Sequence, residues 1–225
     1  MTFQQKMSKQ FKIRASQEAK IHGKTGILKT GKTYINEWCK DKYFNRYTEL
    51  KSKYLKKGIE KEDEAIEMVC DVLDLGMVFK NDKFFENEYA VGTPDIIVKD
   101  FIIDTKCSWN HSTFPLFKHD IDPLYYAQGQ VYMWLTGIHK YKLAYCLVDT
   151  PQNLIESEAW YKCKEMGLDE IDDDIYTKTM NQMTYDDIPK EKRVKIFDFD
   201  FDPLYIETLK ERVLESREYI KTLEL

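Results

Sequence analysis

The 225-residue sequence predicts a single α/β domain, with a mixed sheet flanked by helices. Segments with helical spacing alternate with short apolar runs typical of strands, in the order helix, strands, helix, strand, helix. The length supports one sizeable core and is short for two ordinary domains. Apolar residues make up 43% of the chain, and no apolar run is long enough to cross a bilayer, so we expect a soluble protein.

The first third of the chain is predicted to be mainly helical. Residues 32–43 have apolar side chains at helical spacing, and Ser16 or Thr33 is suited to cap an early helix. A stronger amphipathic helix is predicted over residues 58–75, where an apolar stripe runs along the segment and Gly76 follows it.

Short strands alternate with helices in the rest of the chain. Strands are predicted at residues 84–89, 95–99, 101–107, 141–148 and 194–199. Helices are predicted at residues 124–136, which stop at Gly137, at 154–166 and at 203–222. The stretch 167–190 is acidic and only weakly periodic, which favours a mobile loop.

Residues 95–107 predict a tight β-hairpin that brings two carboxylates together. Two apolar β-branched runs flank the polar pair Lys99-Asp100, and a two-residue turn there sets Asp95 directly opposite Asp104. Their Cβ atoms would lie roughly 5 Å apart, where like charges repel. A hard divalent cation such as Mg²⁺ relieves that repulsion. Lys106 projects from the same strand face as Asp104, so the hairpin predicts phosphate chemistry.

The net charge of −5 hides an asymmetry along the chain. Residues 1–57 hold 15 of the 34 basic residues and 4 of the 39 acidic ones. This segment is able to follow a phosphate backbone, although a solvated lysine-rich surface explains the count equally well. The acidic run 169–174 is typical of solvated surface; alternatively it repels DNA or docks a basic partner.

The cysteines and the N-terminus indicate a reducing compartment. The five cysteines are widely spaced and contain no CxxC pair, which argues against disulfides, a zinc site and an iron–sulfur cluster. The first residues lack the apolar stretch of a secretory signal, so we expect a cytoplasmic protein.

Four ordered motifs resemble the PD-(D/E)XK nucleases, in the lambda-exonuclease and YqaJ-like branch. Pro94-Asp95 with Asp104-Thr105-Lys106 is similar to the family signature. Three further segments match in order: residues 13–16 (IRAS), 58–65 with Glu62, and 126–137 with Gln128 and Tyr132. The resemblance implies a restriction-endonuclease-like core, with residues 1–57 as a basic helical DNA-binding portion, 58–150 as the catalytic core and 151–225 as a C-terminal portion.

The resemblance implies a metal site of defined composition. Asp95, Asp104, Glu62 and the backbone carbonyl of Thr105 would hold Mg²⁺, with Mn²⁺ able to replace it, and Lys106 would complete the catalytic group. Taken alone, Glu62 is one of several glutamates on a helix face, as charge runs usually are.

A second group would bind DNA and its terminal 5′-phosphate. The resemblance assigns this role to Arg14, Ser16, Thr93 and Gln128, with Tyr132 beside the glutamine. Arg14 stands where the family has threonine, and Lys9 or Lys12 is an alternative to it. The hydroxyls are equally suited to caps or turns, and Gln128 to a backbone carbonyl.

Residues 26–33 (GILKTGKT) also match the P-loop pattern of NTPases. A P-loop follows a buried strand, whereas the preceding residues are polar, so we disfavour an NTPase. The sequence thus predicts an exonuclease that resects one strand of duplex DNA from its 5′ end for phage-type recombination, with an endonuclease as the alternative. The family resemblance further implies a homotrimer, a phage source within a bacterial host, and a single-strand annealing partner.

Overall fold

The structure, a computed structural model, describes residues 1–47 and 52–224. Its elements are α1 (Phe3–Gln10), β1 (Ile13–Arg14), the 3₁₀ helix η1 (Ala15–Lys20), α2 (Lys29–Phe44), α3 (Lys53–Val72), β2 (Phe85–Glu86), β3 (Ala90–Gly92), β4 (Ile96–Ile97), β5 (Ile102–Cys107), α4 (Pro123–Thr136), β6 (Lys140–Cys146), α5 (Gln152–Glu165), α6 (Asp173–Met183), the 3₁₀ helix η2 (Lys190–Lys192), β7 (Val194–Asp200) and α7 (Pro203–Lys221). This order confirms the predicted mixed α/β class.

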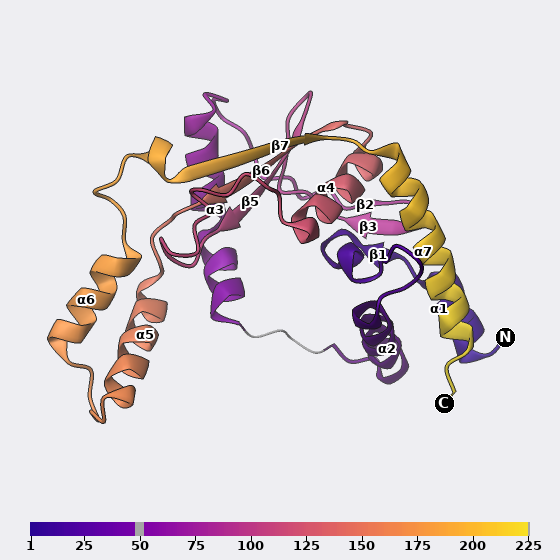
Figure 1. Ribbon diagram of the computed structural model, residues 1–225, viewed down its shortest axis with the longest axis horizontal. Coiled ribbons are helices and arrows are strands. Elements are labelled where there is room, and N and C mark those ends of the chain that lie inside the picture. The colour runs from indigo at the N-terminus through magenta and orange to yellow at the C-terminus, as the bar shows by residue number, and fades with distance from the viewer. Residues whose placement is uncertain (48–51, 225) are drawn as a thin grey trace.

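Two sheets organise the molecule. The larger has the order β4-β5-β6-β7, in which β5 and β6 are parallel and the other neighbours antiparallel. A parallel pair needs a long crossover, which α4 supplies. The smaller sheet has the order β1-β3-β2. Figure 1 shows α1, α2 and α7 towards one end of the molecule and the α5–α6 pair at the other.

Strand alternation divides β5 between two hydrophobic cores. Ile103 packs with Ala65 and Val69 of α3, whereas Ile102 packs with Val131 of α4. Asp104 and Lys106 share the parity of Ile102, so they project towards α4. The strand therefore carries its two charged side chains on the face that the crossover helix covers.

The predicted hairpin register is confirmed. Ile96 pairs with Ile103 and Ile97 with Ile102, and Val98 N donates to Phe101 O at 2.9 Å to close the turn. Extending this register by one residue sets Asp95 opposite Asp104.

The loop predicted at 167–190 is wrong, because α6 lies within it. The Asp172 side chain accepts hydrogen bonds from Asp174 N and Ile175 N, both at 3.0 Å, and so caps the helix. The acidic run lies at the helix N-terminus, where the dipole favours negative charge. Met180 and Met183 pack on α5 through the cluster around Leu154 and Ile155.

Several boundaries also differ from those predicted. Helix α3 begins at Lys53, five residues before the expected Gly58, and the two-residue β1 was not predicted. Residues 26–33 follow η1 and enter the first turn of α2, so the strand that a P-loop requires does not precede them. Within the described ranges, no helix is both long and apolar enough to span a membrane.

Candidate active site

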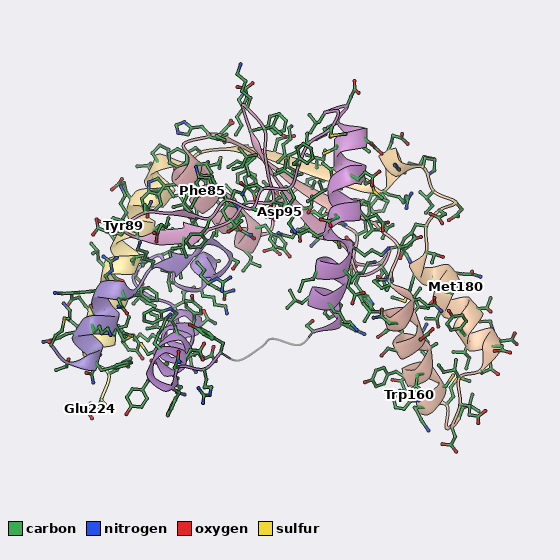
Figure 2. All side chains as sticks on the ribbon, turned by 180° about the vertical axis from the view of Figure 1, so that it is seen from behind. Phe85, Tyr89, Asp95, Trp160, Met180 and Glu224 are labelled. Atoms are coloured by element: carbon green, nitrogen blue, oxygen red, sulfur yellow. The ribbon has the colours of Figure 1, made fainter. Side chains whose placement is uncertain are left out.

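Asp95 directly precedes β4, and Figure 2 shows it near the middle of the molecule. Its Oδ2 accepts hydrogen bonds from Thr105 N at 2.8 Å and from Thr105 Oγ1 at 3.1 Å. Burial and the like charge of Asp104 raise the pKa of Asp95 to about 6, against the opposing effect of Lys106 and of these hydrogen bonds. The hairpin thus holds two carboxylates that repel each other.

Asp104 is buried, with a relative exposure of 1%, and both of its oxygens face other site residues. Oδ1 accepts a hydrogen bond from Gln128 Nε2 at 3.4 Å, and Oδ2 forms an ion pair with Lys106 Nζ. Each oxygen of this buried carboxylate thus has a polar partner.

Lys106 stays protonated in this setting. Burial opposes its charge, but the carboxylates of Asp104 and Asp95 outweigh that effect and raise the pKa of Lys106 above its ordinary value. The predicted trio of Asp95, Asp104 and Lys106 is therefore brought together by β4 and β5 alone.

Gln128 joins this trio from α4. Its Nε2 also donates to Tyr132 Oη at 3.0 Å. The Tyr132 ring lies so close to Gly92 that a Cβ built there would be 2.6 Å from Cε1, so only glycine fits at that point of β3. In this structure Gln128 contacts a carboxylate and a phenol.

Three of the residues predicted to bind a 5′-phosphate lie in or directly beyond the paired strands β1 and β3. β1 pairs with β3 in parallel through Ile13–Ala90 and Arg14–Val91; Ser16 follows β1 as the second residue of η1, and Thr93 directly follows β3. Arg14 and Thr93 are exposed, and Ser16 is partly buried. Their side chains form no hydrogen bond or ion pair with residues 1–47 and 52–224, so they are available to a ligand.

Glu62 lies on α3, where its Oε2 pairs with Lys80 Nζ at 2.6 Å. Among the residues that the structure describes, no three His, Cys, Asp or Glu side chains stand together as a metal-binding group. The structure therefore brings Asp95 and Asp104 together, while the carboxylate of Glu62 is held by a lysine.

Without Glu62, the carboxylates of Asp95 and Asp104 and the backbone carbonyl of Thr105 still suit a divalent cation. Phe101 O faces β4, where it accepts from Val98 N, and Thr105 has the same strand parity as Phe101. The residue opposite Thr105 is Pro94, which has no N–H to donate. The Thr105 carbonyl thus lacks a ladder donor on the side of Asp95, and together with the two carboxylates it forms an all-oxygen set of the kind Mg²⁺ prefers.

Two residues near the site were not found from the sequence. Lys80 reaches Glu62 from 18 positions away, and the lysine-rich composition gave no signal for this pair. Tyr141 is buried behind Asp104; burial first, and then the Asp104 charge, raises the pKa of Tyr141 well above its ordinary value. Its position on β6 follows only from the pairing with β5.

Comparison with solved structures decides the fold. The phage-related exonuclease from Haemophilus somnus 129PT superimposes with a TM-score of 0.78 and 27% identity, over 95% of this chain and 96% of that one. The chain shares its fold with the phage-related exonucleases. The resemblance recognised in the four sequence motifs is thus confirmed.

More distant structures with this exonuclease fold agree. The alkaline exonuclease LHK-Exo from Laribacter hongkongensis has a TM-score of 0.65 at 15% identity, over 98% of this chain and 93% of that one. LHK-Exo in complex with dAMP has the same score and identity, over 97% and 91%. No protein-family model matches the chain, and no curated protein matches it.

Proposed function

We propose that this chain is a Mg²⁺-dependent DNA exonuclease that degrades one strand of duplex DNA from the 5′ end. The observation that carries the proposal is the cluster of Asp95, Asp104 and Lys106 within a fold shared with exonucleases; Asp104 is buried and the other two residues are partly buried. The product would be a duplex with 3′ single-stranded tails, suited to phage-type recombination by strand annealing.

Each residue of the cluster has a chemical task in phosphodiester hydrolysis. Asp95, Asp104 and the Thr105 carbonyl would hold the cation. Bound there, Mg²⁺ supplies Lewis-acid polarisation of a phosphoryl oxygen and lowers the pKa of water. Lys106, kept charged by its neighbours, offsets the negative charge that develops on the phosphoryl oxygens. Gln128 orients Asp104 through the contact at 3.4 Å.

The exposed Arg14 and Thr93 and the partly buried Ser16 support binding of the DNA end. A terminal phosphate would meet a guanidinium and two hydroxyls there, a combination that recognises anions well. Glu62 would join the metal site if Lys80 released it. The proposal includes Mn²⁺ as a substitute, a homotrimer, a single-strand annealing partner and the cytoplasm of a bacterial host.

Digestion of linear duplex DNA tests this function. The wild-type protein, the Asp104→Asn variant and the matched control Lys99→Ala, which alters an exposed lysine in the turn of the same hairpin, are incubated with 5′-phosphorylated or 5′-hydroxyl ends. We expect nucleotide release from 5′-phosphorylated ends by the wild type and by Lys99→Ala, and loss of at least about 10²-fold in Asp104→Asn. EDTA should stop the reaction and added Mg²⁺ should restore it.

Three results would contradict the proposal. Undiminished degradation by Asp104→Asn would show that the proposed catalytic site is wrong. Cutting of closed circular DNA would indicate an endonuclease. A strict requirement for ATP would point to an NTPase.

A further inference from the structure

The ring of Tyr125 is a second neighbour of Lys106, to which the chemistry above gives no role. Lys106 Nζ lies 5.1 Å from the ring centroid, within the range of a cation–π contact. The Lys106 side chain is 21% exposed, so much of its surface is turned away from water. Tyr125 lies in the first turn of α4, one turn before Gln128, and thus on the helix that covers the site face of β5.

The ring is held firmly in place. Tyr125 packs edge-on against Tyr145, with ring centroids 5.9 Å apart and planes at 79°. Tyr145 is the Cα partner of Lys106 in the β5–β6 ladder, and it packs in turn on Phe197. Asp122 caps α4 by accepting a hydrogen bond from Leu124 N at 2.9 Å. Strand pairing and helix capping together fix the ring beside the lysine.

A neutral ring can hold the Lys106 ammonium when a divalent cation takes the carboxylate oxygens. Lys106 is now held by Asp104 Oδ2, one of the oxygens that a divalent cation would take. A cation bound there competes for that oxygen and repels the ammonium. A hard cation does not compete for an aromatic face, which keeps its attraction for the ammonium.

We propose that Tyr125 is a positioning residue that keeps the Lys106 ammonium beside the carboxylate pair when a divalent cation is bound. This inference rests on the proposed function, because it assigns the ring its task in the presence of metal. Loss of the ring, rather than loss of the phenol oxygen, is then the harmful change.

The first experiment reads the contact directly in the wild-type protein. A methylene group over an aromatic face is shifted upfield by the ring current, so we expect an upfield ε-methylene signal for Lys106 in ¹³C-lysine NMR spectra. The signal is assigned by its disappearance in Lys106→Met. It should remain upfield when saturating Ca²⁺ is added, and it should move to the position of the other lysines in Tyr125→Leu. An unshifted signal in the wild type, or one that loses its shift on adding Ca²⁺, would overturn the inference without any variant of Tyr125.

The second experiment separates the ring from the hydroxyl. Tyr125→Leu should lower kcat about tenfold with little change in KM, whereas Tyr125→Phe, which keeps the ring, should stay within about threefold of the wild type. The matched control is Tyr126→Leu, since that ring packs on Phe199 and Tyr205 away from Lys106. This control should lower thermal stability and leave kcat near the wild-type value.

A double-mutant cycle shows whether Tyr125 acts through Lys106. In the Lys106→Met background, Tyr125→Leu should lower the residual rate by less than about twofold, because the group it positions is gone. Equal losses in Tyr125→Phe and Tyr125→Leu, or a full further loss in the Lys106→Met background, would refute the positioning role. If Lys106→Met itself keeps full activity, the proposed catalytic site fails instead, which is a different result.

Discussion

Two lysines, the fully buried Lys57 and the partly buried Lys106, lie in opposite electrostatic surroundings. Lys57 on α3 is fully buried, and its Nζ donates to Trp109 O at 3.0 Å, Val148 O at 2.8 Å and Thr150 Oγ1 at 2.9 Å. These three oxygens are neutral. Lys106 instead meets the carboxylate of Asp104.

The two environments move the lysine pKa in opposite directions. Burial lowers the pKa of Lys57 to about 8, and the more distant carboxylate of Asp149 only reduces that shift. At Lys106 burial acts in the same sense, but the two carboxylates outweigh it and raise the pKa. Burial alone thus leaves a lysine as a structural hydrogen-bond donor, whereas neighbouring carboxylates make it a permanent positive charge.

Removing the permanent charge should have the largest effect. Lys106→Met should lower kcat by about 10²–10³-fold, since the developing charge on the phosphoryl group loses its cation. Initial rates on 5′-phosphorylated duplex DNA measure this, and circular dichroism confirms that the variant is folded. If Lys57→Met lowers kcat as much as Lys106→Met does, the distinction between the two lysines fails.

Removing the structural donor should act on stability. Lys57→Met leaves two carbonyls and a hydroxyl without their donor, and should lower the free energy of unfolding by about 3 kcal/mol at pH 7. Urea denaturation measures the loss. The rate per folded molecule should stay near that of the wild type. A variant of wild-type stability would show that the three oxygens find other partners.

The lowered pKa of Lys57 also makes this stability difference depend on pH. The pKa of Lys57 is about 8 in the folded chain, against an ordinary value of 10.5. Between these two values the unfolded chain binds more protons, so the wild type gains stability as pH rises through this window. The neutral amine still donates to both carbonyls and accepts from Thr150. The deficit of Lys57→Met should therefore grow by about 2 kcal/mol from pH 7.5 to 10, and a constant deficit in urea denaturation would contradict the assignment.

Local sequence patterns predicted the parts of the molecule that form locally. The turn at Lys99-Asp100 and the flanking apolar runs fix the hairpin register, so the facing of Asp95 and Asp104 follows from a segment of a dozen residues. By contrast, α6 was not predicted, because an acidic run precedes it and its few apolar side chains pack against α5.

The partners of Glu62 and the burial of Lys57 were beyond a reading of the sequence. Lys57 is one of 15 basic residues in a segment predicted to face DNA, yet it lies in the interior. The oxygens that accept hydrogen bonds from Lys57 belong to residues 109, 148 and 150. No local sequence pattern marks these oxygens or the pair of Glu62 with Lys80. These contacts depend on how α3 meets the ends of β5 and β6.

The β1–β3 pairing has a consequence for the order of folding. The carboxylate hairpin closes a loop of two residues and should form within microseconds, whereas Ile13 reaches Ala90 only after a loop of more than seventy residues has closed. Arg14 and Ser16 therefore reach β3 and the residues after it late, and the carboxylates of the proposed catalytic site meet before the groups proposed to receive the DNA end. A chain still emerging from the ribosome should thus assemble its carboxylate pair before it completes the proposed site for the DNA end.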